Sequence, residues 1–142
     1  TSPGPSSAAV LPVARRQARE RALSLLYEAE TKDISPTTLI AELPVPPDPF
    51  TASLVVGVGD RQDEIDALIS GHAIGWALDR MPAIDRAVLR MATYELLAGA
   101  DTPTAVILSE AVELAGGYST DESGRFVNGV LSAIAAAVRP SA

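Results

Sequence analysis

The sequence predicts an all-α protein, folded as a single compact domain of six or seven helices. Apolar residues recur at spacings of three and four residues through most of the chain, as they do along one face of an α-helix. No stretch alternates with a period of two, and no Asn-Gly turn joins strand-like runs, so no β-hairpin is predicted. A length of 142 residues, with 47% hydrophobic and 20% charged residues, is typical of one globular domain.

The first predicted helix covers residues 14 to about 30. Arg15, Arg16 and Arg19 are expected near its start, on the side opposite its apolar stripe. Residues 1–13 are rich in Ser, Pro and Gly and are interpreted as a flexible leader, which leaves residues 14–140 as the folded domain. The apolar stripe consists of Ala18, Ala22, Leu25, Leu26 and Ala29.

Two further helices are predicted from their start signals. A Ser-Pro pair at residues 35 and 36 opens a short helix that continues through Leu43. The proline-rich segment 44–49 then forms a rigid connector, because proline fixes φ and lacks a backbone donor. Asp48 can cap the next helix with Pro49 at its first position.

Gly57 and Gly59 are expected to interrupt this third helix, and Asp60 to act as the N-cap of a new one that reaches about residue 78. The single histidine, His72, lies on the apolar stripe of this helix and is predicted to be a packed core residue. The other members of that stripe are Ile65, Leu68, Ile69 and Trp76.

Three helices complete the predicted domain. The first covers about residues 83–98, and Thr102-Pro103 opens the second, which Gly116-Gly117 ends. Ser119 and Glu122 match a capping box at the start of the last helix. The buried positions of this last helix are predicted to be Phe126, Val127, Val130, Leu131 and Ile134.

The residue inventory argues against an enzyme and against a metal or cofactor site. The chain has no cysteine and one histidine, so thiolate metal sites and Cys/His or Ser/His catalytic pairs have few possible members. The acidic pairs Asp63-Glu64 and Asp121-Glu122 lie in the first turns of predicted helices, where carboxylates favour the helix dipole. The absence of cysteine is compatible with a cytoplasmic protein, and no apolar run is long enough to predict a membrane span.

Basic residues are concentrated at one place in an acidic chain. The formal net charge is −7, yet four of the eleven basic residues fall in the segment Arg15–Arg21 (RRQARER). Such a cluster can form a local docking site for a phosphate backbone. It can equally be a solvated helix face balanced by Glu20, Glu28 and Glu30, and charge alone does not decide between the two.

Three segments in register carry a family resemblance. The segment ARRQARERALSLLY at residues 14–27 resembles the N-terminal helix of the NusB family of transcription antitermination factors. The segment IDRAVLRMATYEL at residues 84–96 is similar to that family's central helix. SEAVELA at residues 109–115 and RFVNGVL at residues 125–131 resemble its C-terminal pair, and the resemblance extends from about residue 14 to residue 140.

This resemblance implies two packed helical bundles without catalytic activity. Members of the family pair with NusE, a ribosomal small-subunit protein, bind the single-stranded boxA element of nascent ribosomal RNA, and help RNA polymerase pass terminators. By this resemblance the RNA-binding residues are Arg15, Arg16, Arg19, Tyr27, Glu122 and Arg125.

The resemblance also implies that Asp85, Arg86 and Glu95 lie where the family meets NusE. A carboxylate facing a basic ribosomal protein is electrostatically reasonable. The sequence leaves open whether the chain forms a homodimer.

Two alternatives are left by the sequence. NusB-like domains also form the N-terminal part of some ribosomal RNA cytosine methyltransferases, whose catalytic domain would have to follow this chain. The other alternative is a helical protein–protein adaptor in which RRQARER is only solvated surface.

Overall fold

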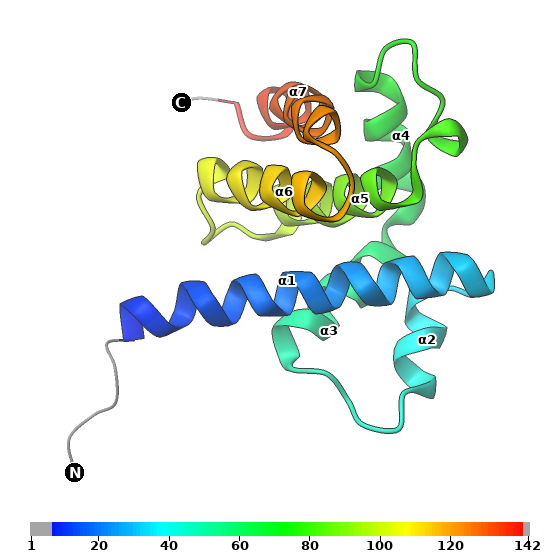
Figure 1. Ribbon diagram of the computed structural model, residues 1–142, viewed down its shortest axis with the longest axis vertical. Helices are drawn as coiled ribbons and strands as arrows, with labels where there is room; N and C mark the ends of the chain where they lie inside the picture. The colour runs from blue at the N-terminus through cyan, green and yellow to red at the C-terminus, as the bar shows by residue number, and fades with distance from the viewer. Residues whose placement is uncertain (1–6, 141–142) are drawn as a thin grey trace.

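The computed structural model describes residues 7–140, with side chains from residue 14 onward, and this part of the chain is helical without strands (Figure 1). The prediction of an all-α domain with six or seven helices is therefore confirmed. The helices are α1 (Ser7–Lys32), α2 (Pro36–Glu42), α3 (Pro49–Asp60), α4 (Gln62–His72), α5 (Ala83–Ala98), α6 (Thr104–Tyr118) and α7 (Asp121–Val138), with a 3-10 turn at Leu78–Arg80.

The helices form two bundles that share one core. In Figure 1, α1, α2 and α3 pack together at one end of the molecule, and α4 to α7 pack together at the other. Helix α5 joins the two bundles, because it packs on α1 and α3 as well as on α4, α6 and α7. Fully buried side chains from both bundles, such as Leu25, Leu54, Leu89 and Leu131, belong to a single apolar cluster.

Two of the predicted helix starts are confirmed by their capping hydrogen bonds. The Ser35 hydroxyl accepts a hydrogen bond from the Thr38 backbone N–H at 3.0 Å, and Pro36 follows at the first helical position. The Asp48 carboxylate accepts from the Thr51 backbone N–H at 3.1 Å. Each cap satisfies a backbone donor that the first turn of a helix cannot pair internally.

The predicted interruption of the third helix is wrong. Helix α3 continues through Gly57 and Gly59 to Asp60. A Cβ atom at Gly57 would overlap the ring of Tyr94 on α5, so this glycine permits close packing of two helices. The absence of a side chain serves a helix contact here and does not break the helix.

The predicted boundaries of the fourth helix also differ from the structure. Asp60 ends α3 and is not an N-cap; Arg61 separates the two helices and provides no side-chain cap. Helix α4 ends at His72, which is half-buried, so Trp76 lies in the following loop and is 53% exposed. The last helix is capped by Thr120 and not by the predicted Ser119.

Helix α1 begins at Ser7, so residues 7–13 of the predicted leader are helical. The first six residues of that leader lie outside the described part of the chain.

Arg139, just after α7, ties the end of the chain to the end of α5. Its guanidinium donates hydrogen bonds to the backbone carbonyls of Leu96 at 2.8 Å, Gly99 at 2.7 Å, Thr102 at 2.7 Å and Glu95 at 3.1 Å. Carbonyls in the last turn of a helix lack intrahelical partners, and a cation there also interacts favourably with the negative end of the helix dipole. Arg139 therefore acts as a side-chain cap for α5.

We expect Arg139→Met to lower the free energy of unfolding by about 2–3 kcal/mol, the range for hydrogen bonds to a charged group in a partly buried site. Urea denaturation measures this loss. Arg80→Met is the matched control, because Arg80 is exposed and has no side-chain partner among the described residues, so its effect should stay within about 0.5 kcal/mol. Equal losses for the two variants would contradict the capping role.

Candidate functional site

The structure divides the arginines of RRQARER into groups with different surroundings. Arg19 is only 3% exposed, and its guanidinium makes two hydrogen bonds of 2.9 Å to the carboxylate of Glu95 on α5. The prediction that Arg19 lies on the exposed side of its helix is therefore wrong. Because Glu95 is also 3% exposed and fully engaged by Arg19, it is not available to a partner protein in this conformation.

Arg16 is exposed but already paired. Its guanidinium lies 3.2 Å from the carboxylate of Glu110 and 3.1 Å from that of Glu113, both on α6. The hydrogen bonds that Arg16 donates to Glu110, together with the charges of both carboxylates, raise the pKa of Arg16. A phosphate that approaches Arg16 must therefore compete with two carboxylates.

Arg15 has a different neighbour. Its guanidinium lies over the ring of Phe50, 3.9 Å from the ring centroid, and that of Arg19 lies 5.4 Å from the same centroid. Arg15 and Arg21 are exposed, and neither makes an ion pair with a carboxylate of the described residues. These two are the residues of the segment whose positive charge is not neutralised by a contact.

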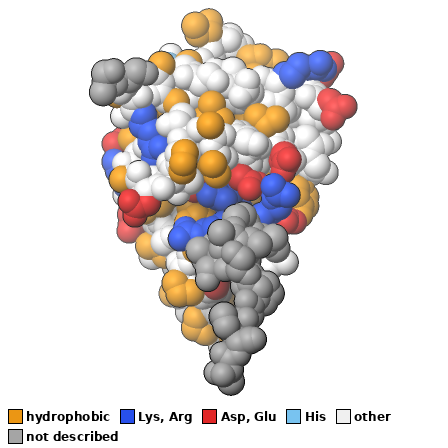
Figure 2. Space-filling model, turned by 90° about the vertical axis from the view of Figure 1, so that its left-hand side faces the viewer, with side chains coloured by type: hydrophobic (Ala, Val, Ile, Leu, Met, Phe, Trp, Pro, Cys, Tyr) orange, Lys and Arg blue, Asp and Glu red, His pale blue; other side chains and the backbone are white. Residues whose placement is uncertain are grey.

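The surface around the N-terminal end of α1 reflects this pairing. In Figure 2, blue and red side chains lie next to one another, and the part of this face that is not grey carries no continuous basic patch. Near the grey residues a few blue side chains lie close together, with red side chains among them.

A groove between α6 and α7 brings one more predicted residue to the same side of the molecule. Arg125 lines this groove of about 510 Å³ together with Glu113, the partner of Arg16. The α6–α7 groove is completed by Ser109, Val112, Gly116, Asp121, Gly124 and Asn128. Arg16 and Arg125, more than 100 positions apart in the sequence, therefore lie at one continuous surface.

Tyr27 lies on the same stripe of α1. Residues 16, 20 and 27 follow a helical spacing, and the carboxylate of Glu20 accepts a hydrogen bond of 2.7 Å from the Tyr118 hydroxyl at the end of α6. Tyr27 itself is 44% exposed. The stripe of α1 that faces the end of α6 thus offers an exposed aromatic ring beyond the arginine pair.

Asp85 and Glu122, predicted to contact different partners, line one pocket. The pocket has a volume of about 320 Å³ and also contains Trp76 and Phe126, whose ring centroids are 5.7 Å apart. Asp85 is only 3% exposed, and its Oδ1 atom has no hydrogen-bond partner among the described residues. A buried carboxylate oxygen without a donor is costly, so this oxygen is suited to receive a donor from outside the chain.

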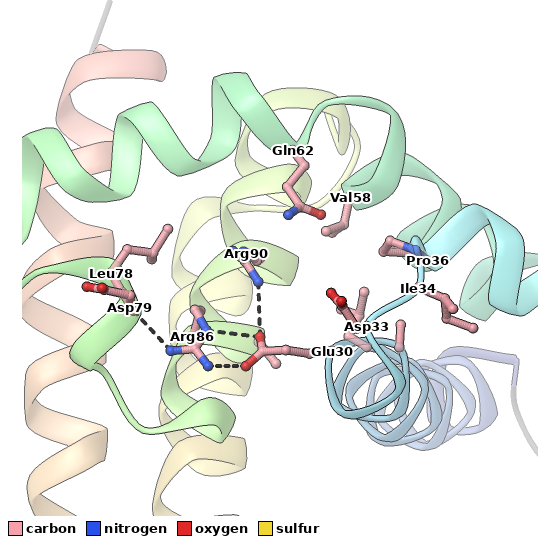
Figure 3. Close-up of a pocket in the computed structure, with 13 residues that line it drawn as sticks. Glu30, Asp33, Ile34, Pro36, Val58, Gln62, Leu78, Asp79, Arg86 and Arg90 are labelled. Carbon is pink, nitrogen blue, oxygen red and sulfur yellow. Dashed lines mark hydrogen bonds and ion pairs between the residues drawn. The ribbon is translucent and has the colours of Figure 1, made fainter.

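Arg86 holds the two bundles together beside a second, larger pocket (Figure 3). It pairs with Glu30 at the end of α1 and donates to the backbone carbonyls of Leu78 at 3.0 Å and Met81 at 2.8 Å. Arg90 bridges Glu30, at 3.2 Å, to Asp66 on α4, at 2.8 Å. Arg86, predicted to meet a partner, is thus occupied by contacts within the chain.

The Arg86 hydrogen bond, together with the charges of Arg86 and Arg90, lowers the pKa of Glu30 despite partial burial. A carboxyl group whose pKa is lower in the folded than in the unfolded chain stabilises the fold above its unfolded pKa. That stabilisation is lost as the pH falls through the folded pKa.

We therefore expect Glu30→Gln to destabilise the protein by about 1 kcal/mol near neutral pH. Below the usual glutamate range, about pH 4.3, the difference from the parent protein should shrink towards zero. Urea denaturation at pH 7 and at pH 3 measures both values. A loss independent of pH would show that the ionised form of Glu30 is not the stabilising species.

The described residues contain no cluster of His, Asp and Glu that could hold a metal ion, and none of the described helices is long and apolar enough to cross a membrane. The expected acidic pairs Asp63-Glu64 and Asp121-Glu122 lie in the first turns of α4 and α7. Sequence reasoning missed Phe50 and placed Trp76 in the core. Aromatic residues make up only 4% of this chain, and this scarcity is the signal that could have pointed to the half-buried Phe50.

Comparisons with known proteins agree on one family. The NusB family model matches residues 16–136. The transcription antitermination protein NusB of Kineococcus radiotolerans is 46% identical over 126 residues, which cover 86% of this chain and 93% of that protein.

Solved structures give the same result. NusB of T. maritima is 35% identical with a TM-score of 0.77, covering 85% of this chain and 89% of that one. A chain from a crystal structure of the antitermination factors NusB and NusE in complex with dsRNA is 28% identical with a TM-score of 0.74, covering 87% of this chain and 96% of that one.

Proposed function

The chain belongs to the NusB family, and from this premise we propose that it is a transcription antitermination factor that binds boxA-type RNA together with NusE. In this role it acts in the cytoplasm as a binding protein and not as an enzyme. It helps RNA polymerase read through terminators only indirectly, through the RNA and NusE.

The observation that carries this proposal is the likeness, over 87% of the chain, to a chain from the structure of NusB and NusE in complex with dsRNA. That structure contains double-stranded RNA, whereas the proposed target here is a single-stranded element. Single strands are recognised by phosphate contacts combined with stacking and base-edge contacts.

Arg15, Arg16 and Arg125 are the proposed phosphate contacts, with Tyr27 about three turns further along α1 from Arg16. Arg15 and Arg125 make no ion pair with a carboxylate of the described residues, while Arg16 must exchange Glu110 and Glu113 for a phosphate. Because Arg19 is buried against Glu95, we assign it a structural role and exclude it from the RNA contacts. Three phosphate contacts on a single strand predict a log–log salt slope of about −2.

The pocket that contains Asp85 and Glu122 is the proposed anchor for NusE. Two carboxylates beside the exposed face of Trp76 suit a basic side chain, which can pair with Asp85 Oδ1 and stack on the ring. The same two carboxylates repel phosphate. We therefore place Glu122 with the protein partner and not with the RNA.

The test is fluorescence anisotropy of a labelled boxA-type RNA, with and without NusE, across a salt series. We expect salt-sensitive binding that becomes tight only when both proteins are present. Binding to NusE without a gain in RNA affinity would contradict the antitermination role and would indicate an adaptor instead.

Charge reversals then separate the two surfaces. The pair Arg15→Glu and Arg125→Glu should abolish RNA binding while leaving helicity and NusE binding intact. Asp85→Asn should weaken NusE binding and leave the intrinsic salt slope of RNA binding unchanged. Arg19 is kept in all these variants, because its loss would strongly destabilise the protein and obscure the result.

A further inference from the structure

We propose that a pocket between α1, α3 and the α5–α6 loop binds one nucleobase of the RNA, stacked on the guanidinium of Arg15. This inference rests on the proposed function and names a subsite within it. The Arg15 pocket, as we call it, has a volume of about 270 Å³; the residues that matter for its chemistry are Arg15, Phe50, Ser53, Tyr94 and Asp101.

The first wall of the Arg15 pocket is a preformed stack. One face of the Arg15 guanidinium lies on the Phe50 ring, 3.9 Å from its centroid. A guanidinium is planar and has a second face, and Arg15 is exposed and lines the pocket. Because the Phe50 ring already orders the arginine, a base that stacks on the second face loses little extra conformational freedom.

The floor of the pocket is electrically balanced. Glu95 lines it, but both carboxylate oxygens of Glu95 accept hydrogen bonds of 2.9 Å from Arg19. Leu54 and the half-buried Tyr94 supply apolar surface beside this pair. A floor whose charges neutralise each other suits the flat body of a base better than an ion.

The charge of Asp101 makes the Arg15 pocket better suited to a base than to a phosphate. Asp101 lines the Arg15 pocket, is exposed, and has no ion-pair partner among the described residues. It repels a phosphate but accepts N–H groups. Two carboxylate oxygens match two neighbouring donors, and guanine presents such a pair at N1 and N2 on its Watson–Crick edge.

The position of the pocket fits an RNA strand that already contacts α1. Arg15 directly precedes Arg16, whose side chain points to α6, so the two successive arginines open onto neighbouring surfaces. A strand whose phosphate contacts Arg16 or Arg15 can turn one base into the pocket. Recognition of splayed-out bases by arginine planes and aromatic rings is common in single-stranded RNA binding.

The experiment combines protein variants with RNA that lacks single bases. The probe is a fluorescent single-stranded boxA-type RNA with NusE present, together with a series in which each nucleotide in turn is made abasic. Arg15→Lys keeps the charge but removes the planar face, and Arg21→Lys is the matched control on the same helix. Thermal unfolding checks that each variant is folded.

We expect Arg15→Lys and Phe50→Leu each to weaken binding of the intact RNA by about tenfold, as the loss of one stacked base does. With the RNA that is abasic at one particular position, both variants should bind like the parent protein. Arg21→Lys should show no such dependence on any single base.

Asp101→Asn tests the edge contact. Replacing guanine by inosine at the sensitive position removes the N2 donor and should weaken binding to the parent protein by about tenfold. Asp101→Asn should bind the two RNAs equally.

Two kinds of failure can be told apart. If the parent protein with NusE binds no RNA, the proposed function fails. If it binds RNA but Arg15→Lys behaves like Arg21→Lys, or loses affinity equally for every abasic RNA, the base pocket is overturned and Arg15 contacts only phosphate.

Discussion

Replacing Arg19 with alanine is expected to lower the free energy of unfolding by about 3–5 kcal/mol, the cost of leaving a buried charge without its partner. Glu95 would keep its carboxylate in a site that is 3% exposed, with both of its hydrogen bonds from Arg19 removed. Such a loss is a large part of the total stability of a domain of this size. Urea denaturation monitored by circular dichroism measures it.

Two controls isolate the pair. Arg21→Ala, on the same helix but exposed, should change stability by no more than about 0.5 kcal/mol. The double variant Arg19→Met with Glu95→Leu should recover most of the loss, because no unpaired charge is then buried. If Arg19→Ala were as mild as Arg21→Ala, the buried pair would not be the structural link between α1 and α5 described above.

The substitution Gly57→Ala is expected to destabilise the protein by at least about 2 kcal/mol, although alanine favours helices more than glycine does. The added Cβ would overlap the ring of Tyr94, so the ring or the helix contact between α3 and α5 has to shift. Thermal and urea denaturation measure the effect. Because Tyr94 also lines the Arg15 pocket, RNA affinity should fall with it.

Gly129 provides the opposite case. It lies inside α7, is exposed, and a Cβ there meets nothing within 4 Å. Gly129→Ala should therefore stabilise the protein by up to about 1 kcal/mol, the helix-propensity difference.

A double-mutant cycle of Gly57→Ala with Tyr94→Ala tests the steric explanation for Gly57 and should show strong coupling. Additive losses would mean that the Tyr94 ring is not the obstacle.

The fold could be predicted because its signals are local in the sequence. The Ser35 and Asp48 caps each lie within three residues of the backbone donor they satisfy, and the apolar stripe of α1 repeats along one helix. Such patterns do not depend on distant parts of the chain. The number and type of helices follow from them.

The surroundings of Arg19 could not be predicted, because its partner is 76 positions away. Arg19 follows Ala18 at the edge of the buried stripe, and only the approach of α5 decides whether that edge is covered. Gly57 was misread for the same reason. Its role depends on Tyr94, which lies on another helix.

The glycine before Trp76 is a local signal that favours a loop at this position, whereas the apolar spacing of the preceding helix predicts a buried residue. Trp76 fits the spacing of the α4 stripe, but α4 ends at His72, and Gly75 in the following loop adopts a φ of 83°, which ordinary residues avoid. The ring therefore turns out of the core and towards Phe126 and Asp85. The pocket that contains Asp85 and Glu122 depends on this turn and not on the stripe.

The pairing of Arg16 with Glu110 and Glu113 acts as a built-in competitor against weak ligands. A cell contains abundant RNA that offers phosphate charge and nothing more, and most of the binding of such RNA to proteins is electrostatic. To reach Arg16, that RNA must first replace two carboxylates, which cancels much of the free energy gained from the arginine–phosphate contact. Under the proposed function, an RNA that also inserts a base and contacts a protein partner regains this free energy from those contacts, so selectivity increases because the charge of Arg16 is masked.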